Sequence, residues 1–511
     1  TNFFAGTEIN STDRSKNYYQ GWGMQYSMGE IPYYVYEFFK KGIEDGNNYY
    51  SLSQTRSRSA AFFANATYSY KGRYTVNGTA RYEGTNRMGK SRSARWLPTW
   101  NVSGAWNAHE EKFFSNLTSV LSHFTLKASY SLTADRGPAD VTNSQAIITS
   151  YSPYRPFTSI QESGLYIKEL ENSELTYEKK HELNIGADMG FLNNRINLAV
   201  DWYKRNNYDL IGIVNTQGAG GQILKYANIA SMKSHGIEFT LSTKNIKTKD
   251  FNWNTDFIFS NAKNEVTDLK QNANVMELIS GNGFAKQGYP VRGLFSIPFV
   301  GLDKDGIPVI INEKGEATST DINFQERQNT GFLKYEGPTD PTITGSLGNM
   351  FSYKGFRLNL FITYSFGNVI RLNPVFKAYY SDLTAMTREF KNRWTLPGDE
   401  AKTNVPAILS KRMYDSNEDL KYAYNAYNYS TERIAKGDFI RLKEISLAYD
   451  FPKAWINPLK LTDLSLKVQA TNLFLIYADD KLNGQDPEFF NAGGVASPVP
   501  RQFTITLRLG L

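Results

Sequence analysis

The sequence contains no cysteine and only four histidines in 511 residues. Without cysteine, a disulfide scaffold, a thiolate zinc site and a cysteine nucleophile are all excluded. The histidines are widely scattered and form no HExxH-type pair, and no GxSxG nucleophile elbow occurs. We therefore predict no catalytic residues, no metal ligands and no cofactor, and we expect that the protein is not an enzyme.

Long hydrophobic runs and a strong charge of one sign are also lacking. No apolar stretch approaches the ~18 residues that a membrane helix needs. Lys and Arg number 57 and Asp and Glu number 50, which leaves a net charge of +7. Such a small excess on a chain of this length gives only a weak case for nucleic-acid binding, and we predict none.

Aromatic residues, by contrast, are abundant. Tyr, Phe and Trp make up 14% of the chain, although the mean hydropathy is −0.47. A chain that is polar on average but rich in aromatics fits a transmembrane β-barrel. In such barrels, lipid-facing apolar residues alternate with lumen-facing polar ones, and aromatic girdles mark the two interfaces.

Alternation with a period of two residues is the dominant local pattern. In residues 501–511 every second side chain is apolar, beginning at Phe503. Residues 463–473 and 356–367 alternate in the same way. The pattern predicts about fourteen strands, each near the ~9–11 residues that span a bilayer with tilt. These strands are about 1–10, 59–70, 73–83, 94–107, 124–134, 180–190, 194–204, 235–244, 251–261, 343–353, 356–367, 439–450, 463–473 and 501–511.

The connections between these strands are mostly short and long in turn. Short links such as 71–72 and 354–355 alternate with long loops, which are about 11–58, 135–179, 205–234, 262–342, 368–438 and 474–500. An outer-membrane barrel has this arrangement, with short periplasmic turns and long extracellular loops. The fold class predicted is therefore an all-β transmembrane antiparallel barrel. A soluble all-β protein with long insertions is the alternative.

Several segments then resemble one known family, the SusC/RagA-like TonB-dependent transporters of Bacteroidetes-type outer membranes. The paired strands RSAAFFANATYSYKGRYTVNGTARYEG begin at Arg58, and the hairpin LNIGADMGFLNNRINLAVDWY begins at Leu183. The segments GPTDPTITGSLGNMFSYKGF and GDFIRLKEISLAYDFP begin at Gly337 and Gly437, and PVPRQFTITLRLGL closes the chain from Pro498. No single segment is specific to this family, but the colinear order of the segments over almost all 511 residues is specific to it.

The resemblance also implies parts that this sequence does not contain. Barrels of this family have 22 strands, preceded by a plug domain and a TonB box. About fourteen strands are found here. The simplest interpretation is that residues 1–511 are the C-terminal portion of the barrel of a longer polypeptide. A self-contained fourteen-stranded channel is a weaker alternative, because it would require the first strand to pair with 501–511.

The resemblance implies a function and partners as well. It implies TonB-dependent import of oligosaccharides or oligopeptides across the outer membrane, together with a SusD-like surface lipoprotein. TonB would act through the absent N-terminal part, outer-membrane lipid would surround the barrel, and two barrel–lipoprotein pairs could form a dimer. The alternative function is a SusC-like barrel that serves as a structural or accessory subunit of a larger outer-membrane assembly for protein insertion or secretion.

Aromatic residues in the long loops are the candidate ligand or partner contacts. Tyrosine offers a flat apolar face with a hydrogen-bonding tip, which suits sugars and peptides. The alternative is that these side chains pack the loops together. The candidates are Tyr33, Tyr34, Tyr36, Phe376, Tyr379, Tyr380, Tyr422, Tyr424, Tyr427 and Tyr429.

Three further expectations concern the strands and one loop. Aromatics at strand ends are predicted to form the interfacial girdles: Tyr68, Tyr70, Tyr82, Trp96, Trp100, Trp106, Trp202 and Tyr203. Four cations are predicted to point inward and to pair with a plug, with guidance of an anionic substrate as the alternative: Arg73, Arg81, Lys127 and Arg357. The sequence DKDG at residues 303–306 hints at a calcium loop, but the glycine and glutamate that an EF-hand requires are missing, so a β-turn is preferred.

Overall fold

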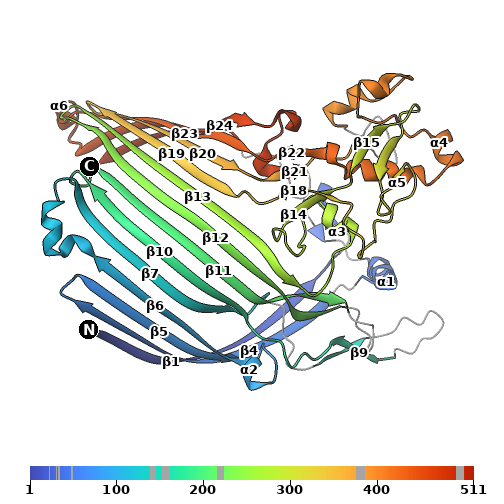
Figure 1. Ribbon diagram of the computed structural model, residues 1–511, viewed down its shortest axis with the longest axis horizontal. Coiled ribbons are helices and arrows are strands. Elements are labelled where there is room, and N and C mark those ends of the chain that lie inside the picture. Colours follow the sequence, from blue (N-terminus) through green and yellow to red (C-terminus); the bar gives the residue numbers. More distant parts are fainter. Residues whose placement is uncertain are drawn as a thin grey trace.

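The computed structural model describes residues 1–21, 24–29, 31–32, 35–47, 50–138, 146–151, 162–215, 224–375, 386–490 and 500–510. Its main feature is one antiparallel sheet of fourteen long strands, each hydrogen-bonded to the next of them in chain order (Figure 1). The strands are β1 (Asn2–Tyr19), β4 (Tyr50–Tyr70), β5 (Tyr74–Thr85), β6 (Trp96–Asn107), β7 (Leu121–Asp135), β10 (Glu178–Phe191), β11 (Ile196–Asn215), β12 (Leu224–Lys247), β13 (Phe251–Leu269), β19 (Ile343–Tyr353), β20 (Phe356–Phe366), β23 (Phe439–Asp450), β24 (Asp463–Ala478) and β25 (Gln502–Gly510).

All fourteen predicted strands are confirmed, and β19 and β23 have the predicted bounds. Several strands are longer than predicted. β1 ends only at Tyr19 and β4 already begins at Tyr50, so both extend into the predicted loop 11–58. Most of the predicted loop 205–234 is strand as well. The added length of β4 at residues 50–58 has mostly polar side chains on both faces, and that of β11 at residues 205–215 places apolar residues next to each other, as at 210–211 and 213–214. Alternation of apolar and polar side chains therefore cannot mark them.

The sheet has one apolar and one polar face, because paired residues in adjacent strands point to the same side. Phe257 lies between Leu241 and Leu347, whereas its neighbour Asp256 lies between Ser242 and Gly348. We call the side that carries Phe257 the apolar face and the side that carries Asp256 the polar face. Exposed aliphatic side chains on the apolar face include Val76, Val102, Leu447, Val468 and Ile505.

The predicted girdle aromatics lie on the apolar face with one exception. Trp202, for example, lies between Ile185 and Ile237 on that face. The prediction for Tyr203 is wrong, because a strand turns consecutive side chains to opposite faces. Tyr203 is on the polar face, where the Arg205 guanidinium lies 3.9 Å from the centre of its ring.

Short turns lie at one end of the sheet and long connections at the other. Lys354–Gly355 joins β19 to β20 as a two-residue turn with positive φ at both positions, as such hairpin turns require. Lys71 and Gly72 also have positive φ, in the three-residue link between Tyr70 and Tyr74. Figure 1 shows the labelled N-terminus and C-terminus at the turn end and the smaller elements of the long connections at the opposite end, called here the loop end. No pairing joins β1 to β25 in the described part of the chain, so the closed fourteen-stranded channel is not formed.

The long connections contain regular structure of their own. Their strands are β2 (Met24–Gln25), β3 (Ile31–Pro32), β8 (Ile147–Tyr151), β9 (Gly164–Glu169), β14 (Gly293–Ser296), β15 (Phe299–Leu302), β16 (Pro308–Ile311), β17 (Ala317–Thr318), β18 (Lys334–Pro338), β21 (Val369–Arg371) and β22 (Ile434–Lys436). Their α-helices are α1 (Tyr36–Glu44), α2 (Arg92–Arg95), α3 (Val275–Ile279), α4 (Lys411–Ser416) and α5 (Leu420–Asn428), and α6 (Lys453–Ile456) lies at the turn end. None of the described helices has the length and apolarity needed to span a bilayer.

The largest buried apolar cluster lies in these connections and not in the sheet. Val275, Leu278 and Ile279 of α3 pack with Phe295 of β14 and Ala426 of α5. An Asn274–Glu277 capping box fixes the start of α3. We call residues 270–342, 369–375, 386–438 and 479–490 the loop module, since they share such packing and hydrogen bonds. The loop module is therefore a folded unit above one end of the sheet.

Candidate functional site

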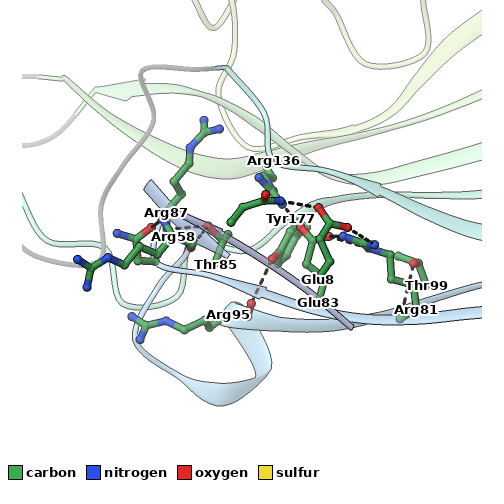
Figure 2. A network of polar contacts seen from close by, with 12 residues as sticks. Glu8, Arg58, Arg81, Glu83, Thr85, Arg87, Arg95, Thr99, Arg136 and Tyr177 are labelled. Atoms are coloured by element: carbon green, nitrogen blue, oxygen red, sulfur yellow. Dashed lines mark hydrogen bonds and ion pairs between the residues drawn. The ribbon is translucent and has the colours of Figure 1, made fainter. Parts of the chain in front are cut away.

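A network of charged side chains occupies the polar face near the loop end (Figure 2). Arg81 is at its centre. Its Nη1 donates to Glu8 Oε2 at 2.9 Å, and its Nε and Nη2 donate to Glu83 Oε2 at 2.8 and 2.6 Å. The second oxygen of Glu83 accepts a hydrogen bond from Arg136 Nη2. Two cations and two anions thus balance each other in one connected group.

The strand register explains how these residues meet. Arg81 and Glu83 are two apart on β5 and so share a face. Glu8 on β1 and Glu83 on β5 both pair with Ala61 of β4, which places them in one row across three strands. The small side chain of Ala61 leaves space between them. Arg136 follows the last residue of β7 at the loop end.

Tyr177 borders this network from the segment before β10, as Figure 2 shows. Its side chain is 3% exposed and packs with Met88 and Leu97. Its hydroxyl donates to the carbonyl of Arg95 at 3.2 Å. Burial raises the pKa of Tyr177 to about 12, so the phenol is neutral at physiological pH. Tyr177 therefore acts as an uncharged, fixed wall beside the ion pairs.

Two hollows follow the polar face of β5, β6 and β7. The first is beside the network, has a volume of about 360 Å³, and is bordered by Arg81, Arg136, Thr79, Thr99 and Asn101 among others. The second, of about 350 Å³, is closer to the turn end. Short side chains such as Asn77, Ser103, Ala105 and Ser129 line it, with Lys127 and Asp201. The short side chains leave this second hollow open.

The inward cations are paired within this chain. Arg73 contacts Glu111 at 3.2 Å, Lys127 contacts Asp188 at 2.7 Å, and Arg357 contacts Asp450 at 2.8 Å. A plug is therefore not needed to neutralise these cations. The polar face is rich in charge but locally balanced.

The candidate aromatic residues occupy different environments. Tyr36, the first residue of α1, is exposed, and so is Tyr422 of α5. Tyr424 and Tyr427 are 0% and 1% exposed, and Tyr429 is half-buried. The other five candidates lie outside the described residues: Tyr33, Tyr34, Phe376, Tyr379 and Tyr380. Tyr36 is on a different element from the other described candidates, which all belong to α5 or its end.

Burial of Tyr424 and Tyr427 follows from the helix they belong to. Leu420, Ala423, Tyr424 and Tyr427 are spaced i, i+3, i+4 and i+7 and are all buried, which is the pattern of a helix face turned to a core. Tyr427 meets Phe299 edge-on, with ring centres 5.4 Å apart. This geometry favours the packing interpretation for these two tyrosines. The helical spacing in the sequence could have revealed it.

A buried arginine joins three segments of the loop module. Arg371 donates from Nη1 to the carbonyl of Ser430 at 2.9 Å, and from Nη2 to those of Phe295 and Ile279 at 2.6 and 3.3 Å. Burial lowers the pKa of Arg371 to about 9, so the guanidinium is still charged at neutral pH. Its charged hydrogen bonds therefore fasten β14, the end of α3 and the segment after α5 to β21.

The DKDG segment forms a turn, as preferred from the sequence. Asp303 Oδ1 accepts hydrogen bonds from the backbone N–H groups of Asp305 and Ile307, both at 2.9 Å. The next turn repeats the arrangement, because Asn312 Oδ1 accepts from Lys314 and Glu316. Each side-chain oxygen satisfies its own turn, as Asx-turns do. The two turns connect β15, β16 and β17 into a small sheet.

Sequence reasoning missed the residues of the polar network other than Arg81. Glu8 and Arg81 are 73 positions apart, so no local pattern joins them. The pair Arg81 and Glu83 did carry a signal, since two opposite charges two residues apart share a strand face. The positions of Arg136 and Tyr177 just outside predicted strands gave no such signal.

Comparison with known proteins identifies relatives of the whole sheet. A family model described as TonB dependent receptor-like, beta-barrel matches residues 1–473. TonB-dependent receptor SusC of Bacteroides thetaiotaomicron is 26% identical over 515 aligned residues, covering 93% of this chain and 47% of the relative. TonB-dependent receptor P39 of Formosa agariphila is 26% identical, covering 96% of this chain and 50% of the relative.

The fold is similar to that of a solved structure, the RagAB peptide importer in its open-open state. The TM-score is 0.74 at 21% identity, and the match covers 100% of this chain and 52% of the other. The likeness at this identity concerns the fold. The chain spans about half the length of the curated relatives it matches.

Proposed function

Because the chain belongs to the TonB dependent receptor-like β-barrel family and is an outer-membrane protein, we propose that it serves TonB-dependent import of oligopeptides or oligosaccharides together with a SusD-like surface lipoprotein. The observation that carries this proposal is the sheet with one apolar and one polar face, the latter hollowed along β5, β6 and β7. The apolar face would contact lipid, and the polar face would line the lumen through which a hydrophilic ligand passes.

We also propose that these fourteen strands are the C-terminal portion of a barrel with about 22 strands. The two outer strands support this, since β1 and β25 each have one hydrogen-bonded neighbour in the described structure. A strand edge facing lipid leaves backbone N–H and C=O groups unsatisfied, which costs several kcal/mol per group. Further strands would satisfy both edges. TonB itself would engage a plug segment outside residues 1–511.

The loop module is the surface proposed for the lipoprotein partner. Its core and its buried arginine give it a fixed shape, and Leu396 and Val300 are large exposed apolar residues on it. Apolar side chains on a rigid rim suit a protein interface. Oligopeptides are the ligand class we favour, because the structurally similar RagAB is a peptide importer.

Uptake measurements on a deletion strain test the proposal. Cells that lack this protein and cells that express it would receive a labelled mixed peptide digest or a labelled oligosaccharide mixture. Import predicts uptake that depends on the protein and stops when a protonophore collapses the proton-motive force. Unchanged uptake, together with loss of other outer-membrane proteins in the deletion strain, would contradict import and favour the accessory-subunit alternative.

A further inference from the structure

The 360 Å³ hollow beside Arg136 is located at the loop end of the polar face, and Arg81, Glu83 and Arg136 are among the residues that line it. We propose that it is a subsite for the carboxylate at the C-terminal end of an oligopeptide ligand, with Arg136 as the group that binds it. This inference rests on the proposed import of oligopeptides and adds a recognition rule to it. The argument depends on which donors of the network are already used.

Arg81 has little capacity left for a ligand. Its Nε, Nη1 and Nη2 all donate to the carboxylates of Glu8 or Glu83. Both oxygens of Glu83 are also engaged, one by Arg81 and the other by Arg136. Arg81 and Glu83 therefore form the structural base of the site and are not its binding groups.

Arg136 differs from Arg81 in this respect. In the described part of the chain it makes one ion pair, from Nη2 to Glu83, although a guanidinium carries five N–H donors. It lines the hollow, and about a third of its side chain is exposed. A guanidinium held in place on one side and open on the other suits a planar carboxylate. Glu83 thus orients Arg136 toward the hollow.

The surrounding charge favours an anion. Beside the balanced network, residues 87–95 add Arg87, Lys90, Arg92 and Arg95, of which Lys90 is paired with Glu171. Clustered positive charge at the edge of a low-dielectric wall raises the local concentration of anionic groups. An incoming carboxylate would therefore be attracted to this side of the lumen.

The lining favours a peptide over a sugar chain. Asn101 offers an amide donor and acceptor of the kind that bind a peptide backbone, and the Thr99 hydroxyl, which donates to the carbonyl of Arg81, can still accept. Sugar sites generally present the face of an aromatic ring. Of the two aromatic residues at the hollow, Tyr177 is 3% exposed, and Trp100 belongs to the apolar face, where it packs against Tyr130. The hollow therefore lacks an available aromatic platform among the residues that the structure describes.

Binding of a peptide pair tests the inference. The probe is a decapeptide of mixed sequence, labelled at its N-terminus, with either a free C-terminal carboxylate or a C-terminal amide. The protein is used in outer-membrane vesicles from cells that express it as encoded. The free acid is expected to bind about tenfold more tightly, the scale of a charge-assisted hydrogen bond to a partly exposed group. Arg136→Gln should remove this preference by weakening the free acid alone.

Two further variants make the result specific. Arg136→Lys keeps the charge but not the planar fork, so it should retain part of the preference. Arg357→Gln is the matched control, because it removes an ion-paired arginine from the turn end of the same face, and it should keep the full preference. Heat-modifiable migration on gel electrophoresis checks that each variant barrel is folded.

Two outcomes would overturn the subsite. One is equal binding of acid and amide by the wild type while peptide uptake is intact. The other is a preference for the free acid that survives Arg136→Gln. Binding of a galacturonic-acid trimer that depends on Arg136, with no binding of either peptide, would overturn the assignment of the ligand as a peptide. Failure of the underlying proposal looks different, because then neither peptide form would be taken up by cells that express the wild-type protein.

Discussion

Gly306 lies directly against the indole ring of Trp394. A Cβ atom on residue 306 would approach the ring to 2.5 Å, and the backbone there has a φ of +75°. The carbonyl of Gly306 also accepts the N–H of Ala407 at 3.0 Å. The tip of the β15–β16 hairpin is therefore docked on residues 386–407, the part of the loop module that precedes α4.

Gly306→Ala is expected to weaken this docking. The added methyl group meets the Trp394 ring and also strains a left-handed backbone position. Gly315→Ala is the matched control, because Gly315 is in the equivalent turn with a φ of +80°, but a Cβ atom added there would have nothing within 4 Å. The control should cost only the backbone strain, about 1–2 kcal/mol. Hydrogen exchange of residues 386–407 should increase in Gly306→Ala and stay unchanged in Gly315→Ala.

The segment around Trp394 should loosen in acid. Backbone N–H groups of Leu396 and Thr395 lower the pKa of Asp399, and the Trp394 indole N–H lowers that of Glu400. A carboxyl whose pKa is lowered by folding contributes its full stabilisation at a pH above its ordinary pKa, which is about 4. This contribution is lost as the pH falls through the lowered pKa of the folded protein. The difference in fluorescence between wild type and Trp394→Phe should change in this range. A difference signal that is flat down to about pH 2 would contradict the assignment.

Tyr427 and Tyr422 should respond very differently to truncation. Tyr427→Ala removes a buried ring that packs on Phe299 and should destabilise the loop module by about 3–5 kcal/mol. Tyr422→Ala, on the exposed side of the same helix, should change stability by less than about 0.5 kcal/mol. The protease sensitivity of the loop module measures the effect of each substitution. Heat-modifiable migration on gel electrophoresis checks that the barrel of each variant is still folded. Similar effects of the two changes would contradict the burial of Tyr427.

Arg371→Met should open the loop module locally. It leaves the carbonyls of Ser430, Phe295 and Ile279 without their donor, at a cost of about 2–4 kcal/mol. Arg292→Met is the control, because the Arg292–Asp340 pair is about half exposed and such pairs contribute about 0–1 kcal/mol. Hydrogen exchange of β14 and β21 should rise in the first variant only.

Neighbouring positions on β24 test the assignment of the two faces. Val468 lies between Leu447 and Ile505 on the apolar face, and Gln469 lies between Ser446 and Thr504 on the polar face. A lysine on the lipid side costs about 2–4 kcal/mol near the bilayer centre. Val468→Lys should therefore reduce barrel assembly and Gln469→Lys should not. The reverse result would mean that the faces are exchanged.

The strands could be predicted from sequence because each spans two different environments. A residue such as Val468 faces lipid and its neighbour Gln469 does not, so composition alternates with the register. This pattern gave all fourteen strands. It failed at loop-end extensions such as residues 51–58 of β4, where all side chains but Leu52 are polar.

The polar network and the loop module could not be predicted in the same way. Glu8 and Arg81 meet only after three strands have paired, and Arg371 reaches carbonyls as many as 92 positions away. Such contacts depend on the complete fold and leave no local pattern. The α5 face with Tyr424 and Tyr427 was predictable in principle, since its helical spacing is visible in the sequence.

The paired turns at Asp303 and Asn312 have a consequence for the order of folding. Each is closed by hydrogen bonds that span two to four residues, so little chain entropy is lost when it forms. The long strands must instead bring distant segments together, and contacts of that kind form slowly. The β15–β16–β17 unit can therefore take its shape while β13 and β19, on either side of it in the chain, are still unpaired. It would enter barrel assembly as a preformed piece.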